Sequence, residues 1–136
     1  MNLSSADAVS AGVVLLVVVT IAYGGTFVLK VVTRQVPAND LQVSFYRAGH
    51  AHAGVLVILG LVILILTSTA GVPDWAEALS SGVLWAAILM PAGFFLSVIG
   101  RDPAKPSRLI ILLWLGAASL TVGLVAAGVG LIIAGT

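Results

Sequence analysis

The chain consists of four long apolar stretches separated by short polar connections. Stretches without Asp, Glu, Lys, Arg or His run for 22, 21, 23 and 28 residues, over 8–29, 53–73, 78–100 and 109–136. A helix needs about 20 apolar residues to cross the hydrocarbon core of a bilayer. The stretches do not alternate apolar and polar residues as membrane strands do, and lipid satisfies no backbone hydrogen bonds. The pattern predicts an all-α bundle of four transmembrane helices, over about 8–32, 44–70, 77–100 and 108–134.

Composition agrees with a single integral membrane domain over 1–136. Hydrophobic residues make up 60% of the chain and charged residues 8%, against about a quarter charged in a soluble domain. The formal net charge of +1 gives nucleic-acid binding no electrostatic basis. The absence of cysteine excludes disulfides, iron–sulfur clusters, zinc ribbons and covalently attached c-type haem.

The cations predict the orientation of the helices. All six flank the first and third connections: Lys30, Arg34, Arg47, Arg101, Lys105 and Arg108. By the positive-inside rule these two basic loops are cytoplasmic and both termini lie outside. The first stretch is too long for the apolar part of a signal peptide and no basic residue precedes it, so we expect a retained span.

Local signals refine the helix ends and suggest a repeat. Asn39 and Asp40 can cap the second helix, Ser107 can cap the fourth, and Pro91 should kink the third. The second helix, expected over about 41–69, exceeds the thickness of the core, so it should tilt or project into the cytoplasmic headgroups. The segments GGTF (24–27) and AGFF (92–95) align at half the chain length, which is consistent with a tandem repeat of two hairpins.

The titratable residues of the second span are the main candidates for chemistry. Ionisable groups at membrane depth are costly and typical of functional sites. Arg47 and His50 share one face of a helix, whereas His52 points roughly 200° away from His50. We expect these three residues to form a functional polar cluster near the cytoplasmic end, with Tyr23 and Thr26 as neighbours. We also expect it to be the only polar cluster inside the bundle.

A metal or cofactor is an alternative use of the same residues. Two histidines spaced i, i+2 cannot chelate one metal from a regular helix, and the other spans offer no further His, Cys or carboxylate. Haem b or a divalent metal would therefore need His50 or His52 from more than one subunit. Gly and Ala residues in the second and fourth spans favour close contacts between helices or subunits, so we expect a homo-oligomer.

Three segments resemble a family of small four-span proteins of bacteria, chiefly actinobacteria. They are FYRAGHAHAGVL (45–56), ILMPAGFFLS (88–97) and IAYGG (21–25). The resemblance implies a multi-pass protein of the bacterial inner membrane, and it implies no activity.

The sequence leaves three functions open. The first is a homo-oligomeric channel or transporter with the Arg47/His50 cluster at its cytoplasmic mouth. The second is a haem- or metal-binding redox accessory protein, and the third is a structural subunit of a larger membrane complex. The sequence contains no nucleophile–base–acid set and no glycine-rich phosphate loop, so we do not expect an enzyme.

Overall fold

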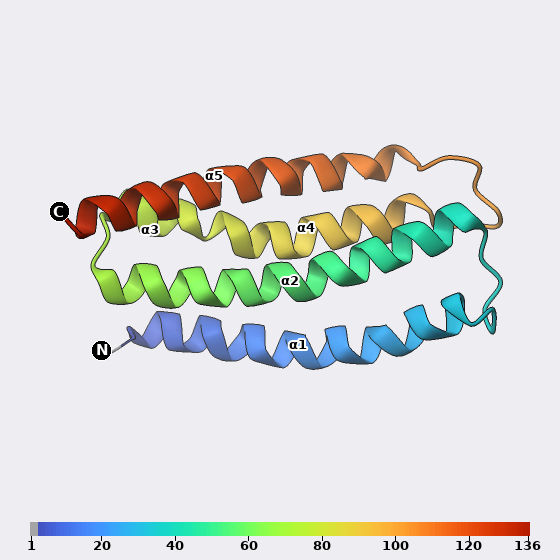
Figure 1. Ribbon diagram of the computed structural model, residues 1–136, viewed down its shortest axis with the longest axis horizontal. Helices are drawn as coiled ribbons and strands as arrows, with labels where there is room; N and C mark the ends of the chain where they lie inside the picture. Colours follow the sequence, from blue (N-terminus) through green and yellow to red (C-terminus); the bar gives the residue numbers. More distant parts are fainter. Residues whose placement is uncertain (1–2) are drawn as a thin grey trace.

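A computed structural model describes residues 3–136 as a bundle of long helices (Figure 1). The elements are α1 (Ser5–Val32), α2 (Asp40–Ala70), α3 (Asp74–Ser80), α4 (Gly82–Ser97), the 3₁₀ turn η1 (Arg108–Ile110) and α5 (Ile111–Ala134). Four helical segments are long and apolar enough to cross a membrane, with α3–α4 and η1–α5 each counted as one. The predicted four-helix membrane architecture is confirmed at this level.

The helices lie side by side in the order α1, α2, α4, α5 (Figure 1). The principal contacts join α4 to α5, α2 to α4, and α1 to α2, while α3 packs on α5. Val28 and Val31 are the buried residues of α1, and both lie in its C-terminal part. The helix α1 is therefore peripheral in the bundle.

The helix ends follow the predicted caps. Asn39 is the N-cap of α2 and forms a capping box with Gln42, while Ser107 accepts a hydrogen bond from the Leu109 N–H at the start of η1. Gly71 closes α2 in the left-handed conformation, with φ of 65°, which glycine adopts without steric cost. The observed α2 of 31 residues is longer than a core-spanning helix needs to be.

The third span contains a break that the sequence analysis did not predict. The helix is interrupted at Ser81, while α4 continues through Pro91. The hydroxyls of Ser80 and Ser81 donate to the carbonyls of Glu77 and Ala78 at 2.7 and 2.6 Å. Such bonds compete with the regular helical ladder, and Gly82 follows immediately. The tandem repeat stays a prediction, and α1 shows no break that would correspond to the one at Ser81.

The core lies between α2, α4 and α5, where small residues allow close approach. Leu56, Ala86 and Met90 form one buried cluster, and Ile63, Val83 and Ala127 form another. The fourth predicted span supplies three glycines seven residues apart, which face Met90, Val83 and Ala76 of the same chain: Gly116, Gly123 and Gly130. Of the two contacts expected for small residues of this helix, with another helix or with another subunit, these three glycines make the first, within the chain itself.

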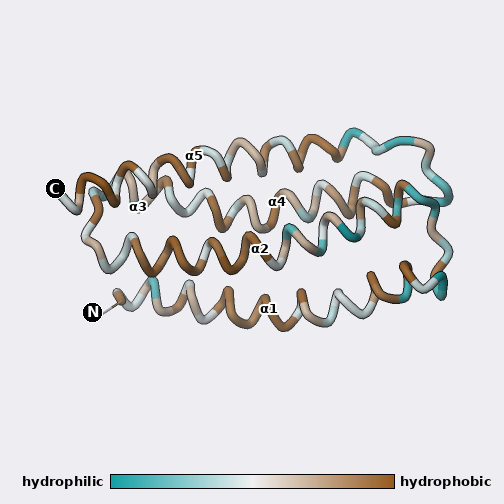
Figure 2. The backbone as a smooth tube through the Cα atoms, viewed as in Figure 1, coloured by the Kyte–Doolittle hydropathy of each residue, from teal (hydrophilic) through white to brown (hydrophobic). Residues whose placement is uncertain are grey.

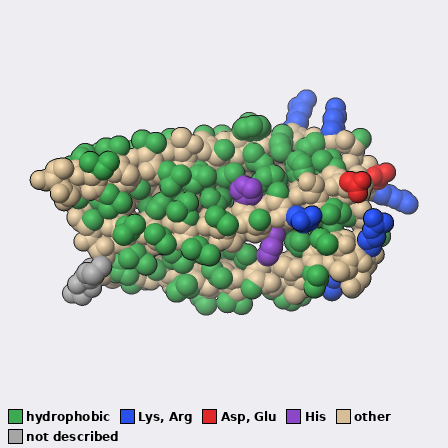
Figure 3. All heavy atoms as spheres, viewed as in Figure 1, with side chains coloured by type: hydrophobic (Ala, Val, Ile, Leu, Met, Phe, Trp, Pro, Cys, Tyr) green, Lys and Arg blue, Asp and Glu red, His purple; other side chains and the backbone are tan. Residues whose placement is uncertain are grey.

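Hydropathy and charge divide the molecule along its length. Apolar residues run through all four helices (Figure 2), and the cations gather around one end (Figure 3). The helix α1 begins, and α5 ends, at the opposite end (Figure 1). This distribution is the one that a multi-pass membrane protein requires, with apolar helix surface facing lipid and charge at the ends.

Candidate functional site

Arg47 and the two histidines of α2 lie on and beside a strip of this helix that is exposed in the single chain. Arg47 and Ala51 are exposed one turn apart, while His50 and His52 are half-buried on either side of them. Both histidines are visible on the open face in Figure 3, toward the basic end. We call Arg47, His50, Ala51 and His52 the α2 face.

His50 lies in the interface between α1 and α2. A Cβ atom added at Gly25 would be 3.2 Å from His50 Nε2 and 3.3 Å from its Cε1. These distances are tighter than ordinary van der Waals contact, so the imidazole fits beside α1 because residue 25 has no side chain. The ring occupies the flank of the α2 face nearest to α1.

His52 lies on the opposite flank, against α4. Its ring centroid is 5.0 Å from that of Phe94, and its Nδ1 is 2.8 Å from the carbonyl oxygen of Ala48. A carbonyl only accepts, so Nδ1 carries a proton, and Nε2 presents a lone pair whenever the ring is neutral. The i, i+2 spacing predicted that the two rings would face apart, and their contacts with different helices agree with that.

Tyr23 and Thr26 do not join the histidines. The Tyr23 side chain is 79% exposed, and the Thr26 hydroxyl donates to the Tyr23 carbonyl at 2.7 Å within α1 itself. Within residues 3–136 no hydrogen bond links either residue to a histidine. No hydrogen bond therefore supports these two expected neighbours, and the contact from α1 to His50 that the structure shows is made at Gly25.

Aromatic side chains that the sequence did not single out pack against one another beside the α2 face. Tyr46 stacks on Phe95 at 5.5 Å between centroids and meets Phe27 edge-on at 5.3 Å. Phe45 meets Phe94 edge-on at 5.6 Å. The sequence signal that could have predicted these contacts is the pairing of adjacent aromatic residues, Phe45–Tyr46 in α2 and Phe94–Phe95 in α4. Adjacent residues on a helix point in different directions, so each member of a pair contacts a different partner.

The start of α2 and the segment after α4, at the basic end of the molecule, are joined by a hydrogen-bonded latch. Gln42 is 6% exposed, and its Nε2 donates to the carbonyls of Val98 and Gly100 at 3.0 and 3.1 Å. Asn39 Nδ2 donates to Asp102 Oδ1 at 2.8 Å. This buried polar group shows that the α2 face is not the only polar cluster of the bundle, contrary to the sequence-based expectation.

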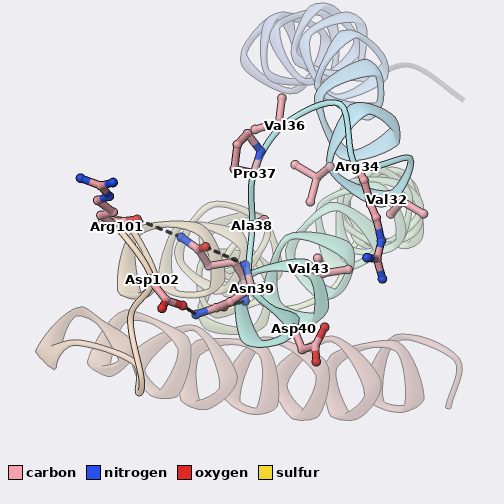
Figure 4. A pocket seen from close by; sticks show the side chains of 13 residues that line it. Val32, Arg34, Val36, Pro37, Ala38, Asn39, Asp40, Val43, Arg101 and Asp102 are labelled. Atoms are coloured by element: carbon pink, nitrogen blue, oxygen red, sulfur yellow. Dashed lines mark hydrogen bonds between the residues drawn. The ribbon is translucent and has the colours of Figure 1, made fainter.

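A large open hollow of about 910 Å³ adjoins this latch (Figure 4). Its charged lining residues are Arg34, Asp40, Arg101 and Asp102, and the two arginines lie on opposite sides of it (Figure 4). Two cations and two carboxylates give the hollow no preferred sign of charge. We therefore regard it as the gap between two loops and do not assign a ligand to it.

The described residues do not form a metal centre within one chain. No group of three or more His, Cys, Asp or Glu side chains lies close enough together in residues 3–136 to hold a metal ion. The two histidines face different helices, so they do not share a ligand. Metal or haem ligation by His52 Nε2 would need further donors from a second chain.

Fold and composition together define a multi-pass membrane protein built from four candidate spanning helices. Comparison with protein families, with curated proteins and with solved structures found no match. What the protein does must therefore be argued from its own geometry.

Proposed function

We propose that this chain forms a homo-oligomeric channel or transporter of the bacterial inner membrane, in which the α2 faces of several copies surround the path. The observation that carries this proposal is an exposed strip of α2 at Arg47 and Ala51, with His50 and His52 half-buried on its two flanks. A four-helix bundle that is open at this face encloses no path of its own. In a path between copies, these titratable side chains would face water and the neighbouring copies instead of lipid.

Energetics favour contact between copies at this face. A charged or strongly polar side chain that faces hydrocarbon costs several kcal/mol, which a partner or a water-filled path removes. Small residues accompany the polar ones: Ala51 is exposed, and a Cβ at Gly54 would meet nothing within 4 Å. Small residues let membrane helices approach closely, so the face is suited to a second copy.

Protons are the species that this arrangement supports best. Imidazole takes up and releases protons near neutral pH, and histidines in membrane helices serve in proton relays. Arg47 beside His50 disfavours a permanently bound cation at the mouth of the path. We therefore take proton flux as the first activity to measure.

One observation favours the alternative of a haem- or metal-binding protein. The hydrogen bond from His52 Nδ1 to the Ala48 carbonyl is the arrangement that commonly orients a ligating histidine, with Nε2 left for the metal. An absorbance spectrum of the purified protein tests this directly. A Soret band that disappears in His52→Ala would support haem ligation, and its absence together with a metal-free elemental analysis would exclude the alternative.

Cysteine cross-linking tests the proposed arrangement of copies. Because the chain has no cysteine, Ala51→Cys introduces a single thiol on the α2 face. We expect it to form a disulfide-linked dimer in native membranes under mild oxidation. Ala118→Cys is the matched control, since Ala118 is an exposed alanine at a similar distance from the basic end of α5.

The control should remain monomeric under the same conditions. Efficient cross-linking through Ala118→Cys, with none through Ala51→Cys, would show that another face mediates assembly and would remove the basis for a path along α2.

A further inference from the structure

A second polar cavity lies at the end of the molecule opposite to the basic loops. It has a volume of about 180 Å³ and lies where α1, α2 and the α3–α4 break meet. Carboxylates and hydroxyls contributed by all three elements line it: Asp7, Ser10, Thr67, Ser68, Glu77 and Ser80. This site is separate from the α2 face, which lies toward the basic end.

Two of the hydroxyl groups that line this cavity give their protons to backbone carbonyls and so present lone pairs to it. Thr67, which is 2% exposed, donates its hydroxyl proton to the Ile63 carbonyl at 2.9 Å. Ser80, which is 5% exposed, donates to the Glu77 carbonyl at 2.7 Å. An ionised carboxylate and a hydroxyl that has given away its proton both act as acceptors. The cavity is therefore lined mainly by acceptors.

Ser68 supplies an independent indication that a ligand belongs here. Its Oγ is buried and has no hydrogen-bond partner within the described part of the chain. An unpaired buried hydroxyl costs about 1–3 kcal/mol, and lipid offers it no partner. Ser68 lines the same cavity as Asp7 and Glu77, so a ligand bound there would satisfy it.

We propose that this outer cavity binds a monovalent hard cation such as Na⁺. Oxygen acceptors without a cationic lining residue select a cation over an anion. The residues described here hold no cluster of three or more His, Cys, Asp or Glu, so the cavity lacks the set of carboxylates with which proteins commonly surround Ca²⁺. The ion would join α1, which otherwise packs chiefly on α2, to the α3–α4 break as well.

The test is the dependence of thermal stability on Na⁺. A ligand that binds the folded state raises the unfolding temperature as its concentration rises. The full-length protein is titrated with NaCl in detergent, with choline chloride holding the ionic strength constant. We expect Na⁺ to raise the unfolding temperature of the wild type. Asp7→Asn and Glu77→Gln should each shift the Na⁺ midpoint at least about tenfold upward.

Two further variants keep the test decisive. Asp74→Asn removes an exposed carboxylate at the same end that does not line the cavity, and it should respond like the wild type. Ser68→Ala keeps all charges and should also raise the midpoint, which covers the case in which a carboxylate variant does not fold. The proposal would be overturned if Na⁺ did not change the unfolding temperature of the wild type, or if Asp74→Asn raised the Na⁺ midpoint as much as Asp7→Asn and Glu77→Gln do. A response to Ca²⁺ without one to Na⁺ would overturn the monovalent assignment.

Discussion

At the scale of single residues, the two histidines differ in what surrounds them. His50 lies beside the backbone of α1 at Gly25, whereas His52 is fixed by the Ala48 carbonyl and the ring of Phe94. His50 therefore lies in the α1–α2 interface, and His52 is a packing contact between α2 and α4. Replacing them should have different consequences for activity and for stability.

Gly25→Ala tests the fit of His50 against α1. Its new Cβ would lie 3.2 Å from His50 Nε2, so the ring or α1 must shift by a few tenths of an ångström. We expect Gly25→Ala to be about 1 kcal/mol less stable to unfolding in mixed micelles than Gly24→Ala, which meets nothing within 4 Å. In a His50→Ala background the difference between the two glycine variants should vanish. A difference that persists there would show that His50 does not set the contact.

The sequence predicted part of this site. Helical spacing alone placed His50 and His52 on different flanks, because the angle per residue is fixed in any α-helix. It did not predict the partners Gly25 and Phe94, because those depend on how α1 and α4 rotate about their own axes when they pack. Gly25 is the residue of α1 that lies against His50, and residue spacing alone does not distinguish it from Gly24.

At the scale of elements, local chemistry predicted the helix ends better than the interruptions. The cap at Asn39 is confirmed, since Asn and Gln three residues apart satisfy the free N–H groups at a helix start. The break at Ser81 escaped prediction because serine is ordinary in membrane helices. Only the structure shows that two serine hydroxyls bond back to the previous turn there.

The C-terminal end of α1 provides a test of backbone strain. Arg34 has a φ of 59° and its N–H donates to the Val31 carbonyl, while the Gln35 N–H donates to the Lys30 carbonyl. This is a Schellman motif with a non-glycine residue at the left-handed position. Arg34→Gly should therefore raise the free energy of unfolding by about 0.5–1 kcal/mol.

Arg34→Ala is the matched control for this change, because it removes the same charge and keeps the strained conformation. It should not be stabilised. Equal stability of the two variants in a denaturant titration would mean that the left-handed conformation at residue 34 stores no strain.

At the scale of the whole molecule, the pattern of long apolar stretches predicted the number of helices but did not predict which helices are neighbours. Lipid-facing and buried sides of these helices are equally apolar, so periodicity carries little information about packing. The peripheral position of α1, the covered glycines of α5 and the outer cavity follow from the three-dimensional arrangement. Charge was informative at this scale, since all six cations flank two connections.

The charge distribution predicts that both termini lie outside. A reporter that fluoresces only in the cytoplasm should be dark when fused after Thr136. The same reporter inserted after Ala104, in the basic loop between α4 and η1, should be bright. The reverse pattern would place the α2 face near the outer surface and the Asp7–Glu77 cavity near the cytoplasm.

Proton flux into proteoliposomes tests the central claim most directly, with purified protein, a pH-sensitive dye inside the vesicles and a potassium diffusion potential as the driving force. Wild-type protein should carry protons faster than protein-free vesicles. His50→Ala should lower this rate at least about tenfold, as expected for a group in the path that supplies about 1.4 kcal/mol. Tyr23→Phe, which alters an exposed hydroxyl on α1, should leave the rate unchanged, and His52→Ala should chiefly lower stability. A wild-type rate equal to that of empty vesicles, or equal rates in wild type and His50→Ala with intact folding, would contradict the proposal that the α2 face conducts protons.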